Sequence, residues 1–266
     1  MLNRNNDIRP RDWTDLQQLL FKECYNEEID RFRSSFVYRG LSDESYELPT
    51  SLMRLNGDYR ILEKPIMRNF KKYADASVEQ GGTVWNWLSI AQHHGLPTRL
   101  LDWTFSPYVA LHFATANIEK FNVDGAIWCV NFIEARQFLP KKLKEQYGKE
   151  RANGSSIEIL NKVCSDLDSF DSLKKKDDFV VFFEPPSIDS RIINQFALFS
   201  VLSSNDLLFN DWLNRHPNLF YRILLPKDMK WEIRDKLDQA NITERIIYPG
   251  LDGLCQWLTR WYYTKK

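Results

Sequence analysis

The sequence lacks the short patterns by which several common enzyme classes are recognised. It has no Gly-x-Ser-x-Gly turn, no Walker phosphate loop, no Gly-x-Gly-x-x-Gly fingerprint and no His-Glu-x-x-His motif. The missing glycine fingerprint argues against a Rossmann site. Only 4 histidines are present, and the adjacent His93 and His94 would point about 100° apart on a helix, which argues against a shared metal ion. We therefore expect no metal.

The sequence also has few cysteines, no net charge and no long apolar run. The 4 cysteines form no Cys-x-x-Cys pair, so we expect reduced, buried thiols. Lys+Arg and Asp+Glu both number 36, so no overall field favours nucleic acid, although this balance is compatible with a local basic cleft. No apolar run follows Met1 or is long enough to span a bilayer. We therefore expect a cytoplasmic protein without a membrane partner.

Aromatic and aliphatic residues are abundant, with 17 Phe, 11 Tyr and 9 Trp, enough for a large core. The patterns predict helices at 12–32, 62–73, around Trp85 and Trp87, at 227–240 and at 251–261. They predict strands at 36–40, 125–132, 179–183, 197–202, 219–225 and 245–248. Because strands do not alternate regularly with helices, this order favours an α+β fold over a doubly wound parallel sheet.

We expect one domain over residues 1–266, with an N-terminal helical part at about 1–35. Between about 141 and 178 the composition shifts to Lys, Glu, Asp and Ser. Charge runs of this kind usually form a solvated surface. The segment is therefore interpreted as a charged insertion or lid rather than as a separate domain.

The most functionally dense stretch runs from Gln92 to Ala114. Gly95 followed by Pro97 is typical of a helix end, and Ser106 followed by Pro107 is typical of a helix start. A helix N-terminus offers unpaired N–H groups to a phosphate. Arg99 and Asp102, between these two signals, are expected to form a buried ion pair that holds the loop.

This stretch also carries a family resemblance. His93-His94-Gly95-Leu96-Pro97-Thr98-Arg99-Leu100-Leu101-Asp102-Trp103-Thr104 resembles the central signature of the FRG domain family. Tyr38-Arg39-Gly40 resembles the element that gives the family its name, and residues 244–254 resemble its C-terminal pattern. The three blocks span roughly residues 36–258.

The order of three elements is similar to that of the ADP-ribosyltransferase fold. They are Arg39 at the end of an early strand, the hydroxyl-rich turn 102–107, and Asn194-Gln195-Phe196 before a late strand. The resemblance implies a mixed or antiparallel β core with surrounding helices, and NAD as the co-substrate. It departs from the pattern at Gln195, where some members carry glutamate. Glutamine cannot act as a base, but its carbonyl oxygen can accept a hydrogen bond from a ribose hydroxyl.

Roles for individual residues follow from this resemblance. Arg39 would clamp a phosphate, the Gly40 backbone would pair with the nicotinamide carboxamide, and Tyr38 or Trp103 would stack on a base. Glu184, His93 and His94 are the candidate bases beside Gln195. The expected NAD-binding residues are Tyr38, Arg39, Gly40, Arg99, Asp102, Trp103, Thr104 and Ser106. Purely structural roles are the alternatives for several of these residues. Arg39 could pair with an acidic side chain, Trp103 could belong to the core, and Gln195 could be structural. Glu184 could be a solvent-exposed residue at a strand end, and His112 is expected to be structural.

The leading hypothesis is a toxin or defence enzyme that cleaves NAD and transfers ADP-ribose to a macromolecule. RNA or DNA is slightly preferred over protein as the acceptor, because Lys and Arg of the insertion beside Tyr147 would suit a phosphate backbone. A toxin would imply an antitoxin partner. The alternatives are a non-catalytic module that binds a nucleotide or a protein, which Gln195 favours, and an NAD hydrolase without transfer.

Overall fold

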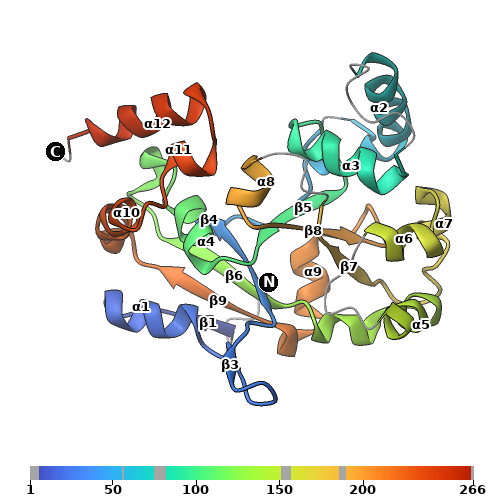
Figure 1. The fold of residues 1–266 in the computed structure, drawn as a ribbon, viewed down its shortest axis with the longest axis horizontal. Helices are drawn as coiled ribbons and strands as arrows, with labels where there is room; N and C mark the ends of the chain where they lie inside the picture. Colours follow the sequence, from blue (N-terminus) through green and yellow to red (C-terminus); the bar gives the residue numbers. More distant parts are fainter. Residues whose placement is uncertain (1–5, 56, 75–81, 151–156, 186–189, 265–266) are drawn as a thin grey trace.

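A computed structural model describes residues 6–55, 57–74, 82–150, 157–185 and 190–264. Its centre is one seven-stranded sheet, drawn in Figure 1. The strand order is β1 (Asp7–Ile8), β9 (Phe220–Leu225), β6 (Gly125–Asn131), β4 (Phe36–Leu41), β5 (Leu100–Thr104), β8 (Ala197–Leu202) and β7 (Val180–Phe183). Only β1 runs parallel to its neighbour. The expected α+β class with a mainly antiparallel sheet is therefore confirmed.

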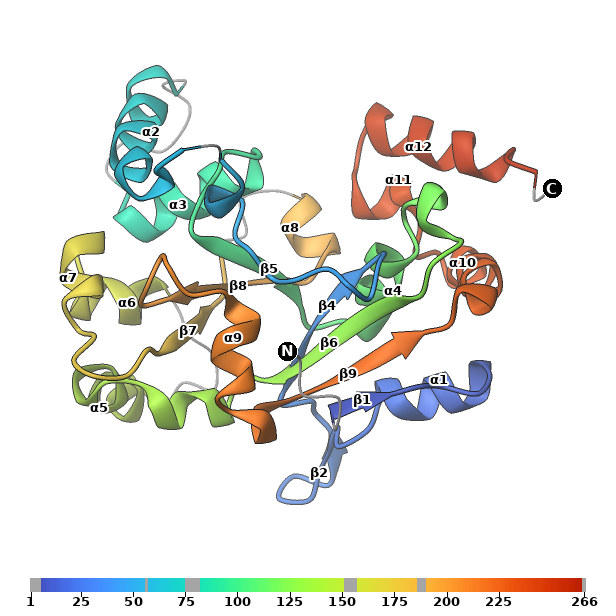
Figure 2. The ribbon, with the colours of Figure 1, turned by 180° about the vertical axis from the view of Figure 1, so that it is seen from behind.

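Helices cover both faces of the sheet. Because strand side chains alternate between faces, Tyr38 points to one face and Val37 to the other. The face of Tyr38 packs against α1 (Trp13–Leu20), α4 (Pro107–Ala114) and α10 (Lys230–Gln239). The face of Val37 packs against α9 (Phe209–Asn214), which lies in front of the sheet in Figure 2.

A third core packs on side chains of β5, β8 and β7. It contains side chains from α2 (Tyr59–Tyr73), α3 (Val84–His93), α5 (Lys141–Glu150), α6 (Ile157–Val163) and α7 (Leu167–Asp171). The last three helices belong to the segment expected to be a solvated insertion. Most charged side chains of these helices are exposed, as expected, but Leu143, Tyr147, Leu160 and Phe170 are buried in this core, so the segment is more than a solvated surface. Only the charged faces of these helices meet solvent.

The predicted N-terminal helix is also shorter than expected. It ends at Leu20, and residues 25–32 form a hairpin of β2 (Tyr25–Asn26) and β3 (Arg31–Phe32). Turn chemistry overrides the helical spacing here. Asn26 accepts hydrogen bonds through Oδ1 from the N–H groups of Glu28 and Ile29, and Asp30 adopts a φ of 51°.

The predicted strand at 245–248 is a helix, α11 (Glu244–Ile247), followed by α12 (Leu251–Trp261). A short apolar run does not distinguish a strand from a buried helical turn. Here the N–H groups of Ile246 and Ile247 bond back to Thr243, which fixes the helical turn. The remaining predicted elements, including the helices around residues 62–73 and 84–93 and the other five strands, are confirmed.

The described segments contain no helix that combines the length and the apolar character needed to cross a bilayer.

Candidate functional site

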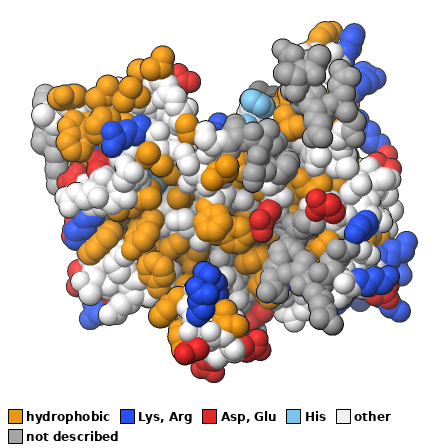
Figure 3. Space-filling model, in the orientation of Figure 1, with side chains coloured by type: hydrophobic (Ala, Val, Ile, Leu, Met, Phe, Trp, Pro, Cys, Tyr) orange, Lys and Arg blue, Asp and Glu red, His pale blue; other side chains and the backbone are white. Residues whose placement is uncertain are grey.

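A cavity lies where β4 and β5 separate. β4 pairs with β6 along its whole length and β5 pairs with β8 along its whole length, but β4 and β5 meet in one pair, Tyr38 opposite Thr104. The cavity beside this gap has a volume of about 240 Å³ and is walled by β4, β5, α3, α4, α8 (Ser190–Asn194) and the start of β8. Figure 3 shows the surface hollowed between the C-terminal helices and the helices α2 and α3.

Arg39 crosses this gap. Its Nη1 donates to the main-chain oxygen of Asp102 at 2.5 Å and lies 3.8 Å from the Asp102 carboxylate. Burial lowers the pKa of Arg39, the charge of Arg54 acts in the same direction, and Asp102 opposes both. The Arg39 side chain is 19% exposed. The site thus holds a largely buried cation that a ligand anion would stabilise.

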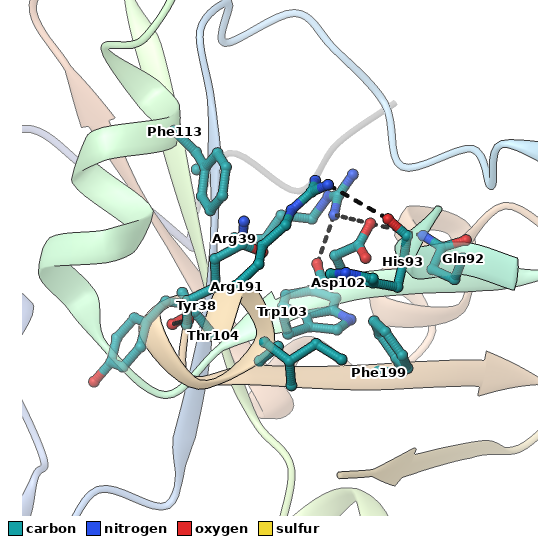
Figure 4. Close-up of a pocket in the computed structure, with 14 residues that line it drawn as sticks. Tyr38, Arg39, Gln92, His93, Asp102, Trp103, Thr104, Phe113, Arg191 and Phe199 are labelled. Atoms are coloured by element: carbon teal, nitrogen blue, oxygen red, sulfur yellow. Dashed lines mark hydrogen bonds and ion pairs between the residues drawn. The ribbon is translucent and has the colours of Figure 1, made fainter. Parts of the chain in front are cut away.

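Asp102 supplies a carboxylate to the cavity. Its side chain is 55% exposed, and Oδ2 accepts a hydrogen bond from Nε2 of Gln92 at 2.8 Å. Gln92 is oriented in turn by Thr98, whose hydroxyl donates to Oε1 at 2.5 Å. These bonds fix the direction of the carboxylate relative to Arg39. Figure 4 shows Gln92, Asp102 and Arg39 in the cavity wall.

The expected ion pair between Arg99 and Asp102 was wrong. Residues three apart in a strand point to opposite faces, so these two side chains diverge. Arg99 is buried and pairs instead with Glu63, at 2.5 Å between Nη2 and Oε2, and with Asp171, at 2.6 Å between Nη1 and Oδ1. Arg99 therefore ties β5 to α2 and α7. It does not line the cavity.

The two aromatic residues expected to stack on a base belong mainly to the core. Tyr38 is 0% exposed, and its hydroxyl contacts Cys24, Ser34 and the carbonyl of Leu20. Trp103 is 3% exposed and donates from Nε1 to the hydroxyl of Ser200 at 2.8 Å. Both form part of the cavity wall, but neither presents an open ring face.

The absence of a side chain at position 40 has a structural reason. A Cβ at Gly40 would lie 1.8 Å from the main-chain oxygen of Ala110 and 2.7 Å from the nitrogen of Ala114. The missing side chain therefore lets α4 pack directly on β4. Gly40 also lines the cavity, and the pairing of its backbone with a carboxamide stays a prediction.

The hydroxyl-rich turn is occupied by internal bonds. Thr104 donates from Oγ1 to the carbonyl of Gln195 at 2.7 Å and accepts from the N–H of Ser106 at 3.0 Å. Ser106 accepts from the N–H of Val109, so its predicted capping role is confirmed, with Pro107 opening the helix. Thr104 lines the cavity, whereas Ser106 does not.

Gln195 lines the cavity, but its amide has a structural partner. Its Nε2 donates to the carbonyl of Ile247 at 3.2 Å, and Nδ2 of Asn194 donates to Ile246 at 2.7 Å. The two amides hold α8 against α11. The carbonyl oxygen of the Gln195 side chain is the atom that remains suited to a ligand hydroxyl.

Of the three candidate bases, only His93 lines the cavity. His94 is exposed at the C-cap of α3, where its ring packs edge-on against His93 with 5.0 Å between centroids. Glu184 is exposed just after β7 and lies outside the cavity wall. His112 is buried and structural, as expected, and burial with the nearby Arg234 charge lowers its pKa to about 3.

Six further lining residues were not singled out from the sequence: Gln92, Phe113, Arg191, Ile192, Ala197 and Phe199. Figure 4 shows the Arg191 side chain beside that of Arg39, with its Nη1 donating to the carbonyl of His93 at 3.4 Å. Arg191 and Gln195 are four residues apart, the spacing of one helical face. That spacing was the available signal for Arg191.

Within the described ranges, no group of three or more His, Cys, Asp or Glu residues is placed to hold a metal ion.

The FRG domain family model matches residues 34–123. The chain therefore carries an FRG domain, which contains Arg39 and Asp102 together with β4, β5, α3 and α4. Arg191, Gln195 and the C-terminal helices lie outside the matched region. No curated protein and no solved structure matches the chain.

Proposed function

We propose that this protein is an ADP-ribosyltransferase of the toxin or defence type, which cleaves NAD and transfers ADP-ribose to a macromolecule in the cytoplasm. The observation that carries the proposal is the arrangement of Arg39, Arg191 and Asp102 in one cavity at the gap between β4 and β5. Guanidinium groups bind phosphate oxygens, and a carboxylate stabilises positive charge that develops on ribose.

In this proposal the cavity holds one half of NAD, in keeping with its small size. Ligand sites for small molecules typically measure about 300–1,000 Å³, and this cavity measures about 240 Å³. The nicotinamide riboside half would enter the cavity, and the adenosine half would lie in the hollow above it. Arg39 would then meet the diphosphate between the two halves.

In the proposed reaction the bond between ribose C1′ and the nicotinamide nitrogen breaks, and nicotinamide leaves with the bonding electron pair. Asp102 faces the cationic ribose that results, and the side-chain oxygen of Gln195 accepts a hydrogen bond from a ribose hydroxyl. The acceptor nucleophile attacks C1′ and loses its proton. His93 and Asp102 are the groups of the cavity wall placed to take that proton.

RNA or DNA remains the preferred acceptor in this proposal, but the residues that support this preference differ from those expected from the sequence. Tyr147 is buried and cannot stack on a base. Lysines 141, 142, 175 and 176 instead line a groove of about 730 Å³ between α5 and the segment leading into β7. Ammonium groups along a groove suit a phosphate backbone. A toxin of this type would be held inactive by an antitoxin partner.

A non-catalytic module that binds a nucleotide or a protein is the second candidate. It is favoured by Gln195, because the amide at the position of the expected catalytic carboxylate is bonded to α11. NAD hydrolysis without transfer is the third.

Incubation with NAD tests these candidates together, with and without cellular RNA and protein. We expect released nicotinamide and ADP-ribose bound to a macromolecule. Asp102→Asn should lower nicotinamide release by about 10²–10³-fold, the usual effect of removing one electrostatic group. Arg39→Lys should weaken NAD binding measured by calorimetry, because lysine cannot make the bidentate contact. Arg60→Lys, at an exposed position, is the control.

The products separate the candidates. Free ADP-ribose would indicate a hydrolase, and NAD binding without nicotinamide release would indicate a binding module. If the protein neither binds nor consumes NAD, the proposal is wrong.

A further inference from the structure

The short helix α8 reaches the cavity only because the C-terminal helices support it. Asn194 and Gln195 donate to the carbonyls of Ile246 and Ile247 of α11 at 2.7 and 3.2 Å. A five-residue helix has little stability of its own. The position of α8, and therefore of Arg191, is set by α11.

Tyr248 follows α11 directly and forms a seat for Arg191. The Arg191 guanidinium carbon lies 5.1 Å from the centroid of the Tyr248 ring, within the range of a cation–π contact. Phe113 of α4 packs edge-on against the same ring, with 6.5 Å between centroids. The Tyr248 ring on one side and the His93 carbonyl at 3.4 Å hold the guanidinium. Figure 4 shows the Arg191 side chain beside that of Arg39.

Buried charges keep this seat in place. Arg260 of α12 bonds to Glu244 of α11 at 2.6 Å and to Asp238 of α10 at 2.6 Å. Burial alone would raise the pKa of Glu244, but the Arg260 hydrogen bond and the charge of Arg234 outweigh it and lower the pKa to about 2. A shift of α11 would leave these charges unpaired, so the backbone that carries Tyr248 is rigidly supported.

We propose that Arg191, seated on Tyr248, is a second phosphate-binding group, and that Arg39 and Arg191 together bind the diphosphate of a nucleotide. Tyr248 acts as a positioning residue, because its ring contacts Arg191 and is absent from the cavity wall. The identification of the natural ligand as NAD rests on the proposed function. The affinity for a diphosphate does not depend on any cleavage of NAD.

Calorimetry with ADP and with adenosine measures the diphosphate contribution directly. We expect ADP to bind more tightly than adenosine to the full-length protein. Tyr248→Leu and Arg191→Gln should each weaken ADP binding about tenfold, in line with one lost charge or cation–π contact, and should leave adenosine binding unchanged. Tyr248→Phe keeps the ring and should bind ADP as the wild type does.

Tyr262→Leu is the matched control, because this tyrosine is 78% exposed at the end of α12. Thermal unfolding without ligand identifies any variant that fails to fold, and in that case Arg191→Gln, at a half-buried position on the short helix, carries the test alone. A Tyr248→Phe variant as weak as Tyr248→Leu would refute the seat. So would equal affinities of the wild type for ADP and adenosine.

The outcome is separable from that of the proposed function. If ADP binding follows the expected pattern while NAD is not cleaved, the diphosphate site stands and the transferase is wrong. If NAD is cleaved but ADP binding is the same in wild type, Tyr248→Leu and Arg191→Gln, the diphosphate site is wrong and the transferase stands.

Discussion

Gly40 offers the sharpest test of how the site is built. The substitution Gly40→Ala adds one methyl group, at a position where β4 and α4 are in main-chain contact. The added carbon would lie 1.8 Å from the carbonyl oxygen of Ala110, 2.8 Å from its carbon and 2.7 Å from the nitrogen of Ala114. Because all three obstructing atoms belong to the backbone, no side-chain rotation can relieve the clash.

The magnitude follows from the movement required. To reach ordinary van der Waals contact, α4 would have to retreat by roughly 1.5 Å, since carbon and oxygen atoms pack at about 3.5 Å. That retreat would disturb Leu111 and Ala114, which are fully buried against the sheet. Overpacking of a core costs about 1–3 kcal/mol or more. A backbone clash belongs at the upper end, so we expect Gly40→Ala to lower the free energy of unfolding by at least about 3 kcal/mol.

Urea denaturation and thermal melting measure this loss. For a domain of this size, 1 kcal/mol corresponds to about 2–4 °C in Tm, so the variant should melt at least about 6 °C below wild type. Gly148→Ala is the matched control. Gly148 lies in α5, and no atom is within 4 Å of its added carbon. Alanine should stabilise that helix by about 0.5–1 kcal/mol. Equal melting of wild type and Gly40→Ala would refute the packing argument.

Two further predictions concern buried charge. Arg99→Ala leaves the buried carboxylate of Glu63 unpaired, so denaturant titration should show that the free energy of unfolding falls by about 3–5 kcal/mol. The control Arg60→Ala, at the surface, should change it by less than about 1 kcal/mol. Equal effects of the two substitutions would contradict the burial of the Arg99 pair. Stability should fall as the pH drops below about 6.5, because the unfolded chain binds a proton at His112 whereas the folded pKa is about 3. The expected slope is about 1.4 kcal/mol per pH unit, and it should steepen below about 4.5 as Glu244, with a folded pKa of about 2, is protonated in the unfolded chain. Flat stability between pH 6.5 and 4 would show that His112 is not held neutral.

Local signals in the sequence were sufficient for much of the fold. Ser106 before Pro107 marked the start of α4, and Gly95 followed by Pro97 marked the end of α3, because capping depends on neighbouring backbone atoms. Five strands of the large sheet were visible as apolar runs, whereas β1 and β5 were not predicted. The hairpin at 25–32 and the helix α11 were missed because a short apolar segment takes its conformation from its turn residues and its packing partners.

The site could be predicted only in part. Arg39 and Asp102 were singled out, but their contact joins residues 63 positions apart, which no local pattern specifies. Partners of Arg99 lie 36 and 72 positions away. The sequence analysis paired Arg99 with Asp102, and both the face of Arg99 and the identity of its partners required the fold. The spacing of Arg191 from Gln195 was a local signal, but its place in the cavity wall required the position of α8.

The contacts of Gln195 explain why this position carries an amide. Its Nε2 must donate to the carbonyl of Ile247 to hold α8 against α11. A carboxylate has no donor, so it would face that carbonyl with two acceptors opposed, and a buried acceptor without a donor is costly. Glutamine is therefore required by the docking of α11. If the site stabilises a cationic ribose, the negative charge must come from elsewhere in the cavity wall. Asp102 of the adjacent strand β5 is the carboxylate in the cavity wall, and Gln92 of α3 holds it by a hydrogen bond.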